Sequence, residues 1–182
     1  MNTMDPDTME PHGLTQRISG EKSSMTQKAV QDYYPDDIAV CYGCGKSNKH
    51  GYQIKTYWEG EETVCRFQPQ AYHTAFPGYV YGGLIASLID CHATATAASA
   101  KYHEEGKSLG IGTVERFITA ALHVDYLAPT PIDVPLELRG RVKESKGRKM
   151  VISVTLSAEG KETARGEVVA LKMPEDFLSK QK

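Results

Sequence analysis

Long apolar runs are absent from this sequence, and so is an apolar stretch near its N-terminus. A membrane-spanning helix needs about 20 consecutive apolar residues, and a secretory signal needs an apolar core of about 7–15 residues. Neither is found here, so the sequence predicts a soluble, cytoplasmic protein without a membrane partner.

An excess of charge of either sign is also missing. The 21 Lys and Arg residues stand against 23 Asp and Glu residues, which gives a formal net charge of −2. Binding to nucleic acid generally depends on a positive field, and this balance supplies none. We therefore expect no nucleic-acid partner.

Cysteine is scarce, with four residues in 182. Without an export signal we expect free thiols and not a disulfide framework. Cys41 and Cys44 form a Cys-x-x-Cys pair, which is half of a zinc site. A second pair with suitable spacing is missing, although His50, Cys65 and His73 are conceivable ligands. We expect a tight turn with two buried thiols and no metal site; a zinc-linked interaction module is the alternative.

The N-terminal region has a different composition from the rest of the chain. Residues 1–25 are rich in Met, Asp, Pro, Ser, Thr and Gly and show no period. Such a segment buries little apolar surface, so we predict a mobile tail over residues 1–30. With 40% hydrophobic residues in the whole chain, residues 31–182 are expected to form one domain. A short helix over residues 26–34, stopped by Pro35, is also expected.

One long helix is predicted over residues 83–103. This segment contains no proline and is rich in alanine, the strongest helix former. Gly106 follows as a plausible C-terminal cap. Apolar residues recur at spacings of three and four and should face a sheet; they are Leu84, Leu88, Cys91, Ala95 and Ala98.

The remaining segments have the period of two that is typical of strands. Residues 51–58 and 62–68 read as a hairpin, and residues 68–77 as a loop. Four further runs lie within residues 112–127, 134–142, 150–156 and 164–170. The predicted fold class is therefore α+β, with one central helix wrapped by a curved, mostly antiparallel sheet of about six strands. One helix covers only one face, so pairing with a second copy is expected to protect a sheet edge.

The stretch from Pro77 to Asp90 combines two features with chemical potential. Gly82 and Gly83 stand where the helix begins, and glycines there let backbone N–H groups approach a ligand. Asp90 lies about two turns further on, in an otherwise apolar segment, where a carboxylate needs a partner or a task. One alternative is that Asp90 is simply paired with a neighbouring polar side chain.

These residues resemble the signature of the hot-dog-fold thioesterases, specifically the phenylacetyl-CoA-thioesterase-like group. That family has His-Gly-Gly-x-x-x-x-Leu-x-Asp, and the chain has Gly82-Gly83-Leu84-x-Ala86-x-Leu88-x-Asp90. The resemblance extends over residues 41–173. It includes Cys41-x-Gly-Cys44-Gly, His73, Pro77-Gly78 and the run His123-Val-Asp-Tyr126-Leu-x-Pro129.

The resemblance implies an acyl-CoA thioesterase with no cofactor, since coenzyme A is part of the substrate. It implies that the backbone N–H of Gly82 donates a hydrogen bond to the thioester carbonyl, with Gly83 beside it at the substrate. It also implies that Asp90 is the general base or the nucleophile. Thr119 would position water, although a threonine also suits a strand without any further role. Tyr81 replaces the family's histidine, and His73 could supply an imidazole instead.

The resemblance also implies a homodimer, or a tetramer built as a dimer of dimers. Eight helical residues span about 12 Å, so Gly82 and Asp90 of one chain cannot serve one carbonyl. In related enzymes the helix start of one subunit faces the acid of the other. Four basic residues near one predicted turn are candidates for the phosphates of coenzyme A, or else a solvated turn; they are Lys143, Lys146, Arg148 and Lys149.

Two other functions are known for proteins that bind acyl thioesters. A non-catalytic acyl-CoA-binding protein is compatible with Tyr81 in place of the histidine. Enoyl-thioester hydratases share the fold but carry a Gly-Asp-x-Asn-Pro-x-His-like run, which is absent here.

Overall fold

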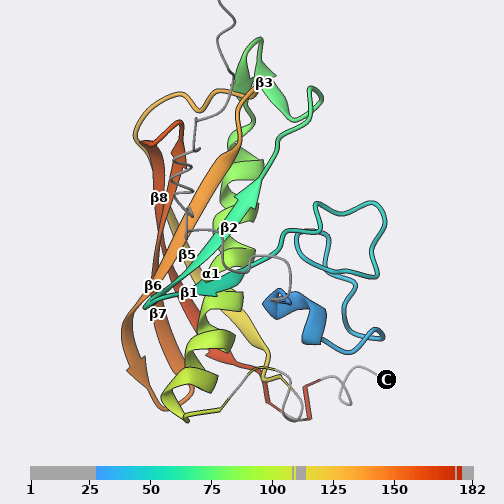
Figure 1. Cartoon of the computed structure of the whole chain (residues 1–182), viewed down its shortest axis with the longest axis vertical. Coiled ribbons are helices and arrows are strands. Elements are labelled where there is room, and N and C mark those ends of the chain that lie inside the picture. Colours follow the sequence, from blue (N-terminus) through green and yellow to red (C-terminus); the bar gives the residue numbers. More distant parts are fainter. Residues whose placement is uncertain (1–27, 108, 110–113, 175, 178–182) are drawn as a thin grey trace, which may run out of the picture.

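The computed structural model describes residues 28–107, 109, 114–174 and 176–177. It consists of one long helix, α1 (Gly82–Glu104), packed on a six-stranded antiparallel sheet with the order β1-β2-β6-β7-β8-β5 (Figure 1). The strands of this sheet are β1 (Tyr57–Glu59), β2 (Glu62–Phe67), β5 (Phe117–Tyr126), β6 (Leu136–Lys146), β7 (Lys149–Ala158) and β8 (Lys161–Lys172). The predicted hot-dog arrangement is confirmed.

Helix α1 begins and ends close to the predicted positions. Tyr81 has an extended backbone before the first turn, and the chain leaves the helix through Gly106, whose φ is +63°. Glycine adopts this left-handed conformation without strain. The predicted apolar stripe is buried along its whole length.

Two segments differ from the prediction. Residues 51–56 do not extend the first strand, because they hydrogen-bond to the preceding loop: the Tyr52 N–H donates to the Tyr42 carbonyl over 2.9 Å. The predicted loop over residues 68–77 contains β3 (Thr74–Phe76), which pairs with β4 (Tyr79–Val80) around Gly78, where φ is +86°.

The N-terminal predictions fall partly outside the described residues. Residues 1–27 of the predicted tail lie there, whereas Ala29 and Val30 are fully buried and belong to the packed domain. The expected short helix is a single 3-10 turn, η1 (Val30–Tyr33). No helix among residues 28–107, 109, 114–174 and 176–177 combines the length and apolarity needed to cross a membrane.

A buried polar network lies where α1 meets β2 and the residues before β1. His92, on α1, is completely buried, and its Nδ1 lies 3.0 Å from the Thr56 hydroxyl. Its Nε2 lies 3.3 Å from the Thr63 hydroxyl, which is 2.6 Å from that of Thr96. Gln31 donates to Thr56 over 3.1 Å, so the Thr56 hydroxyl proton is available to His92. His92 is thus a structural residue.

Burial should make this network sensitive to acid. Desolvation lowers the pKa of His92 to about 3 in the folded chain, whereas an unfolded histidine titrates near 6.5. Between these two pKa values the unfolded state binds a proton at His92 and the folded state does not. The free energy of unfolding therefore decreases as the pH falls. We expect this group alone to lower the free energy of unfolding by about 2 kcal/mol between pH 7 and pH 5. Urea unfolding at both pH values measures the effect.

The comparison needs two variants. His92→Gln should lose most of this pH dependence, and His50→Gln, at an exposed position, should keep it. An unchanged pH dependence in His92→Gln would show that His92 is not held neutral in the fold.

Candidate active site

The start of α1 presents two unused hydrogen-bond donors. The N–H groups of Leu84 and Ile85 bond to the Tyr81 carbonyl, and the Tyr81 N–H bonds to the His73 carbonyl over 2.9 Å. Within the described part of the chain, nothing accepts a hydrogen bond from the N–H of Gly82 or Gly83. With the positive end of the helix dipole at the same point, this geometry favours a negatively charged or polarised oxygen.

The two glycines have different reasons to be glycine. A Cβ added to Gly83 would lie 2.3 Å from the Tyr81 ring, so the ring and any side chain at 83 exclude each other. A Cβ on Gly82 would lie 3.4 Å from the Tyr126 ring, which is ordinary contact. The Tyr126 hydroxyl donates to the Gly82 carbonyl over 2.9 Å and fixes the helix start against β5.

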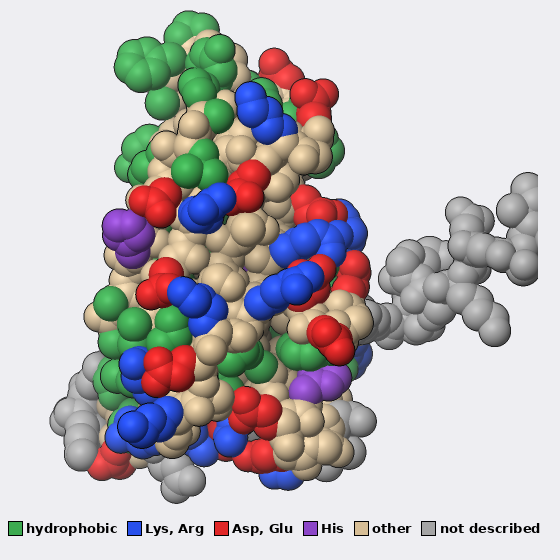
Figure 2. Space-filling view, turned by 90° about the vertical axis from the view of Figure 1, so that its left-hand side faces the viewer, with side chains coloured by type: hydrophobic (Ala, Val, Ile, Leu, Met, Phe, Trp, Pro, Cys, Tyr) green, Lys and Arg blue, Asp and Glu red, His purple; other side chains and the backbone are tan. Residues whose placement is uncertain are grey.

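A mostly apolar cavity of about 620 Å³ opens beside Gly82. It lies between the first turn of α1, the β3–β4 hairpin and the chain that follows β5. Figure 2 shows hydrophobic side chains gathered at the upper end of the molecule, where Figure 1 places β3. The lining residues are Ala75, Phe76, Tyr79, Val80, Gly82, Ile85, Tyr126, Leu127, Ala128, Pro129 and Thr130.

Asp90 lies further along α1 and is half-buried. The hydroxyl of Thr119 donates a hydrogen bond to its Oδ1. Burial raises the pKa of Asp90, the Thr119 hydrogen bond opposes this rise, and the charge of the Cys41 thiolate adds to it. The structure therefore brings Asp90 and Thr119 together, as a carboxylate with raised proton affinity and a hydroxyl that orients it.

The position of Thr119 follows from an irregularity of β5. The pairing of β5 with β8 shifts register between Thr119 and Ala121, as in a β-bulge. Bulges redirect side chains and are frequent beside active sites. Thr119 is exposed on the edge strand while it reaches Asp90, so the pair opens toward the edge of the sheet.

Gly82 and Asp90 do not meet within one protomer. Eight residues of helix separate them, which corresponds to about 12 Å. The cavity beside Gly82 is not lined by Asp90 or Thr119. The chain thus carries unused N–H donors and a half-buried carboxylate at two separate places along α1.

The His73 imidazole does not line the cavity beside Gly82. Its ring lies among those of Tyr52, Phe67 and Tyr72, and its Nδ1 accepts the Gln70 N–H over 3.0 Å. Burial lowers the pKa of His73, which keeps the ring neutral near pH 7.

Tyr81 is exposed at the helix start. Its phenol lies near that of Tyr52, whose pKa is raised first by burial and then by Tyr42 and Tyr81. Tyr42, Tyr52 and His73 line a second cavity of about 210 Å³. The site thus carries phenols near the position where the family has its histidine.

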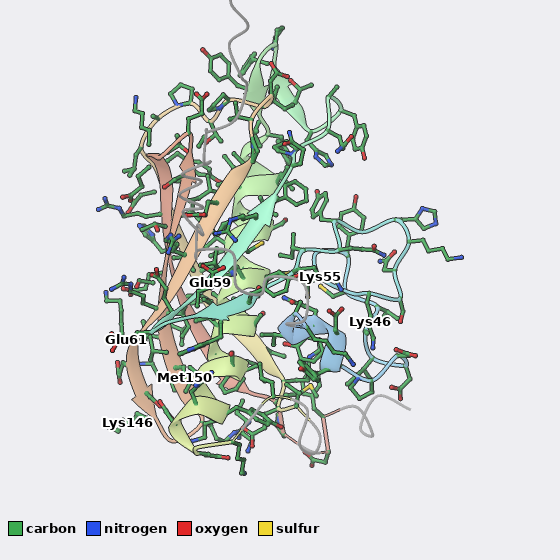
Figure 3. All side chains as sticks on the ribbon, in the orientation of Figure 1. Lys46, Lys55, Glu59, Glu61, Lys146 and Met150 are labelled. Atoms are coloured by element: carbon green, nitrogen blue, oxygen red, sulfur yellow. The ribbon has the colours of Figure 1, made fainter. Side chains whose placement is uncertain are left out.

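The four basic residues lie at the other end of α1. Ser145, on the same hairpin, contacts Glu104 in the last turn of the helix over 3.4 Å, and Figure 3 shows Lys146 at the lower end of the molecule, opposite β3 in Figure 1. Lys143 is paired with Glu167, Lys149 is 3.5 Å from Glu144, and Arg148 donates to the Lys172 carbonyl. In the protomer these residues are not brought to the cavity.

A cluster of three thiols was not foreseen from the sequence. Cys91, on α1, joins Cys41 and Cys44, and their sulfur atoms all lie within 4.8 Å of one another. The conceivable further ligands in the sequence are His50, Cys65 and His73, and none of them belongs to this cluster; Cys65 is buried on β2. Only the packing of the loop on α1 reveals Cys91 as the third member.

Comparisons with known proteins give a consistent family assignment. A family model described as "Thioesterase superfamily" matches residues 77–165. A thioesterase superfamily protein from Shewanella loihica PV-4 is 52% identical, with a TM-score of 0.56, over 70% of this chain and 97% of that one. The E. coli PaaI protein from the phenylacetic acid degradation operon is 14% identical, with a TM-score of 0.55 over 68% of this chain and 81% of its own, and shares the fold.

Curated relatives agree at lower coverage. The acyl-coenzyme A thioesterase THEM4 of Rattus norvegicus is 28% identical over 123 residues, which are 66% of this chain and 47% of that protein. THEM4 of Xenopus laevis is 32% identical over 108 residues, 59% of this chain and 43% of its own. The chain therefore spans about half the length of the curated relatives that it matches.

The hydrogen bond between Thr119 and Asp90 leads to a prediction about titration. Because the bond favours the charged carboxylate, Thr119→Val should raise the pKa of Asp90 further above its ordinary value, and Thr119→Ser should keep it. Carbon-13 NMR of the labelled aspartate carboxyls measures this, with Asp90→Asn to assign the signal. A pKa for Asp90 that falls in Thr119→Val would contradict the assigned role of the bond.

Proposed function

Because this chain belongs to the thioesterase superfamily, we propose that it hydrolyses the thioester bond of an acyl-coenzyme A to a carboxylic acid and free coenzyme A. The observation that carries the proposal is the pair of unused N–H groups at Gly82 and Gly83 beside an apolar cavity. The cavity is large enough for an acyl group and the adjoining pantetheine arm, because ligand sites typically measure about 300–1,000 Å³.

The donors at the start of α1 act on the thioester carbonyl. Attack on this carbonyl places negative charge on its oxygen, and fixed N–H groups stabilise that charge without reorganisation. We assign the Gly82 N–H as the main hydrogen-bond donor to the carbonyl oxygen. Gly83, next to it, has no side chain that would block the substrate. Loss of one such donor typically costs about a hundredfold or more in rate.

Asp90 activates the nucleophile. As a general base it takes a proton from water while the water oxygen bonds to the carbonyl carbon, and collapse of the intermediate breaks the carbon–sulfur bond and expels the coenzyme A thiolate. The raised pKa of Asp90 increases its basicity, and Thr119 holds one carboxylate oxygen in place. Alternatively the carboxylate attacks the carbonyl carbon directly, breaks the carbon–sulfur bond and expels the coenzyme A thiolate; water then cleaves the resulting anhydride to the carboxylic acid and the free Asp90 carboxylate.

A complete site needs two protomers. The donors and the base are about 12 Å apart on one helix, so the donors of one chain would face the base of its partner. Strand β5 supports this arrangement: it pairs only with β8 among the described strands, most of its residues are exposed, and it carries Thr119. An edge strand of ten residues is a ready surface for a second copy.

Binding of the nucleotide phosphates by the basic residues of the β6–β7 hairpin also requires the partner. In one protomer Lys146 and its neighbours lie at the far end of α1 from the cavity (Figure 3). We therefore propose that these residues bind the phosphates of coenzyme A at the site whose backbone N–H donors belong to the other chain.

Removal of the base should nearly abolish turnover. We expect Asp90→Asn to lower kcat by about 10²–10⁴-fold on the best acyl-CoA of a panel, because proton transfer by a positioned base contributes this much. Release of free thiol, followed with a thiol reagent, is the measurement. The control is Asp133→Asn, at an exposed position outside the cavity lining, which should retain the wild-type rate.

Two outcomes would count against the proposal. Wild-type turnover in Asp90→Asn would remove Asp90 from the chemistry. Tight acyl-CoA binding without hydrolysis of any substrate would identify a non-catalytic binding protein, the function that Tyr81 in place of the family's histidine leaves open.

Mixed dimers should reveal sites shared between chains. Gly82→Pro removes one N–H at the first helical position, where proline is tolerated, and the extended backbone of Tyr81 (ψ 128°) suits a residue before proline. We expect Gly82→Pro and Asp90→Asn each to be nearly inactive. Refolding them together in equal amounts should restore about a quarter of wild-type activity, because half of the dimers then contain one intact site. If both groups of a site came from one chain, mixing would restore nothing.

A further inference from the structure

We propose that Cys41, Cys44 and Cys91 form a binding site for a thiophilic divalent metal ion, zinc above all. Their three sulfur atoms lie within 4.8 Å of one another, and those of Cys41 and Cys91 are 3.8 Å apart. Sulfur atoms bound to one zinc ion at about 2.3 Å in tetrahedral geometry lie about 3.8 Å from each other. The thiols therefore stand close to the corners that a tetrahedral ion requires.

The backbone around Cys41 and Cys44 has the form of a metal-binding turn. The Gly45 N–H donates to the Cys41 carbonyl over 2.8 Å, which closes the turn across the Cys-x-x-Cys pair. Metals bind cysteine in its thiolate form, so a turn that holds two cysteines beside a third provides suitable ligands.

Two glycines leave room for this arrangement and for nothing larger. A Cβ on Gly43 would lie 2.4 Å from the Cys91 sulfur and push it out of the cluster. A Cβ on Gly45 would lie 2.5 Å from the backbone nitrogen of Cys41. Both glycines thus serve the close approach of the turn to α1.

The surroundings suit a site of net negative charge. Three thiolates with a divalent ion carry a charge of about −1. Arg116 stands nearby: its guanidinium lies 4.0 Å from the centre of the Tyr34 ring and interacts electrostatically with Cys44. Among the described residues no fourth carboxylate, imidazole or thiol joins the three, so the fourth corner falls to water. Cys41 is only partly buried and gives that corner access to solvent.

A bound ion would tie an irregular segment to the central helix. The chain from η1 to β1 has few ladder hydrogen bonds and packs on α1 through turns. The same segment supplies Tyr42 and Tyr52 to the second cavity, and Cys91 directly follows Asp90 on α1. The ion would fix this segment beside the carboxylate without taking part in hydrolysis, so the proposal stands independently of the proposed function.

Cobalt(II) is the probe of choice, because thiolate ligation gives it intense sulfur-to-metal absorption in the near ultraviolet. The full chain is kept reduced, stripped of metal with a chelator and titrated with cobalt, and zinc is then added. We expect saturation at one ion per chain, displacement of cobalt by zinc, and a higher melting temperature with zinc bound. In Cys41→Ser, the least buried member of the cluster, we expect affinity to fall by more than about 100-fold.

The matched control is Cys65→Ser, which alters an equally free but separate buried thiol and should bind cobalt as the wild type does. Circular dichroism establishes that each variant is folded. Absence of sulfur-to-metal absorption in the reduced wild-type chain overturns the proposal, as does equal loss of binding in Cys65→Ser. Failure to bind metal combined with loss of two thiols in air identifies a disulfide-forming pair instead and likewise overturns it.

Discussion

The close approach of α1 to the sheet is the constraint on which the rest of the structure depends. The helix face is built from alanines and medium-sized apolar residues. At two points where the helix contacts the sheet, the strand residue is a glycine. A Cβ on Gly140 of β6 would lie 2.5 Å from the Thr96 hydroxyl, and one on Gly166 of β8 would lie 2.4 Å from Ile89. Larger residues at either position would lift the helix from the strands and open voids along both.

Several features follow from this packing. His92 is surrounded on all sides and must satisfy its polar atoms with threonines instead of water. Asp90 lies on the side of the helix near the open sheet edge, where a strand hydroxyl reaches it. The first turn of α1 extends to the apolar cavity, so its N–H groups keep no partner in the described chain. One helix thus carries a buried apolar face, a half-buried carboxylate and N–H groups without a partner in the described chain.

The sequence allowed the fold to be predicted because its signals are local. Alanine content and apolar spacing indicated α1, and alternation indicated β6, β7 and β8 within a few residues. The short β3–β4 hairpin was missed because Tyr79-Val80 is too brief to show a period. At the site, the resemblance identified Gly82, Asp90 and Thr119, and the structure joins the last two. The contacts of Tyr126 with Gly82 and of Cys91 with Cys41 could not be predicted, because they depend on how distant segments pack.

The position of β5 at the sheet edge has a consequence for the order of assembly. Its pairing partner is β8, and β6 and β7 lie between these two strands in the sequence. Phe117 therefore pairs with Lys172 only after β6, β7 and β8 have been synthesised. During synthesis on the ribosome, β5 therefore waits without a neighbour until the last strand emerges. The strand that would receive a second chain is among the last parts of the domain to gain its shape. Until then both edges of β5 carry unpaired backbone N–H and C=O groups, which leaves the nascent strand open to wrong pairing.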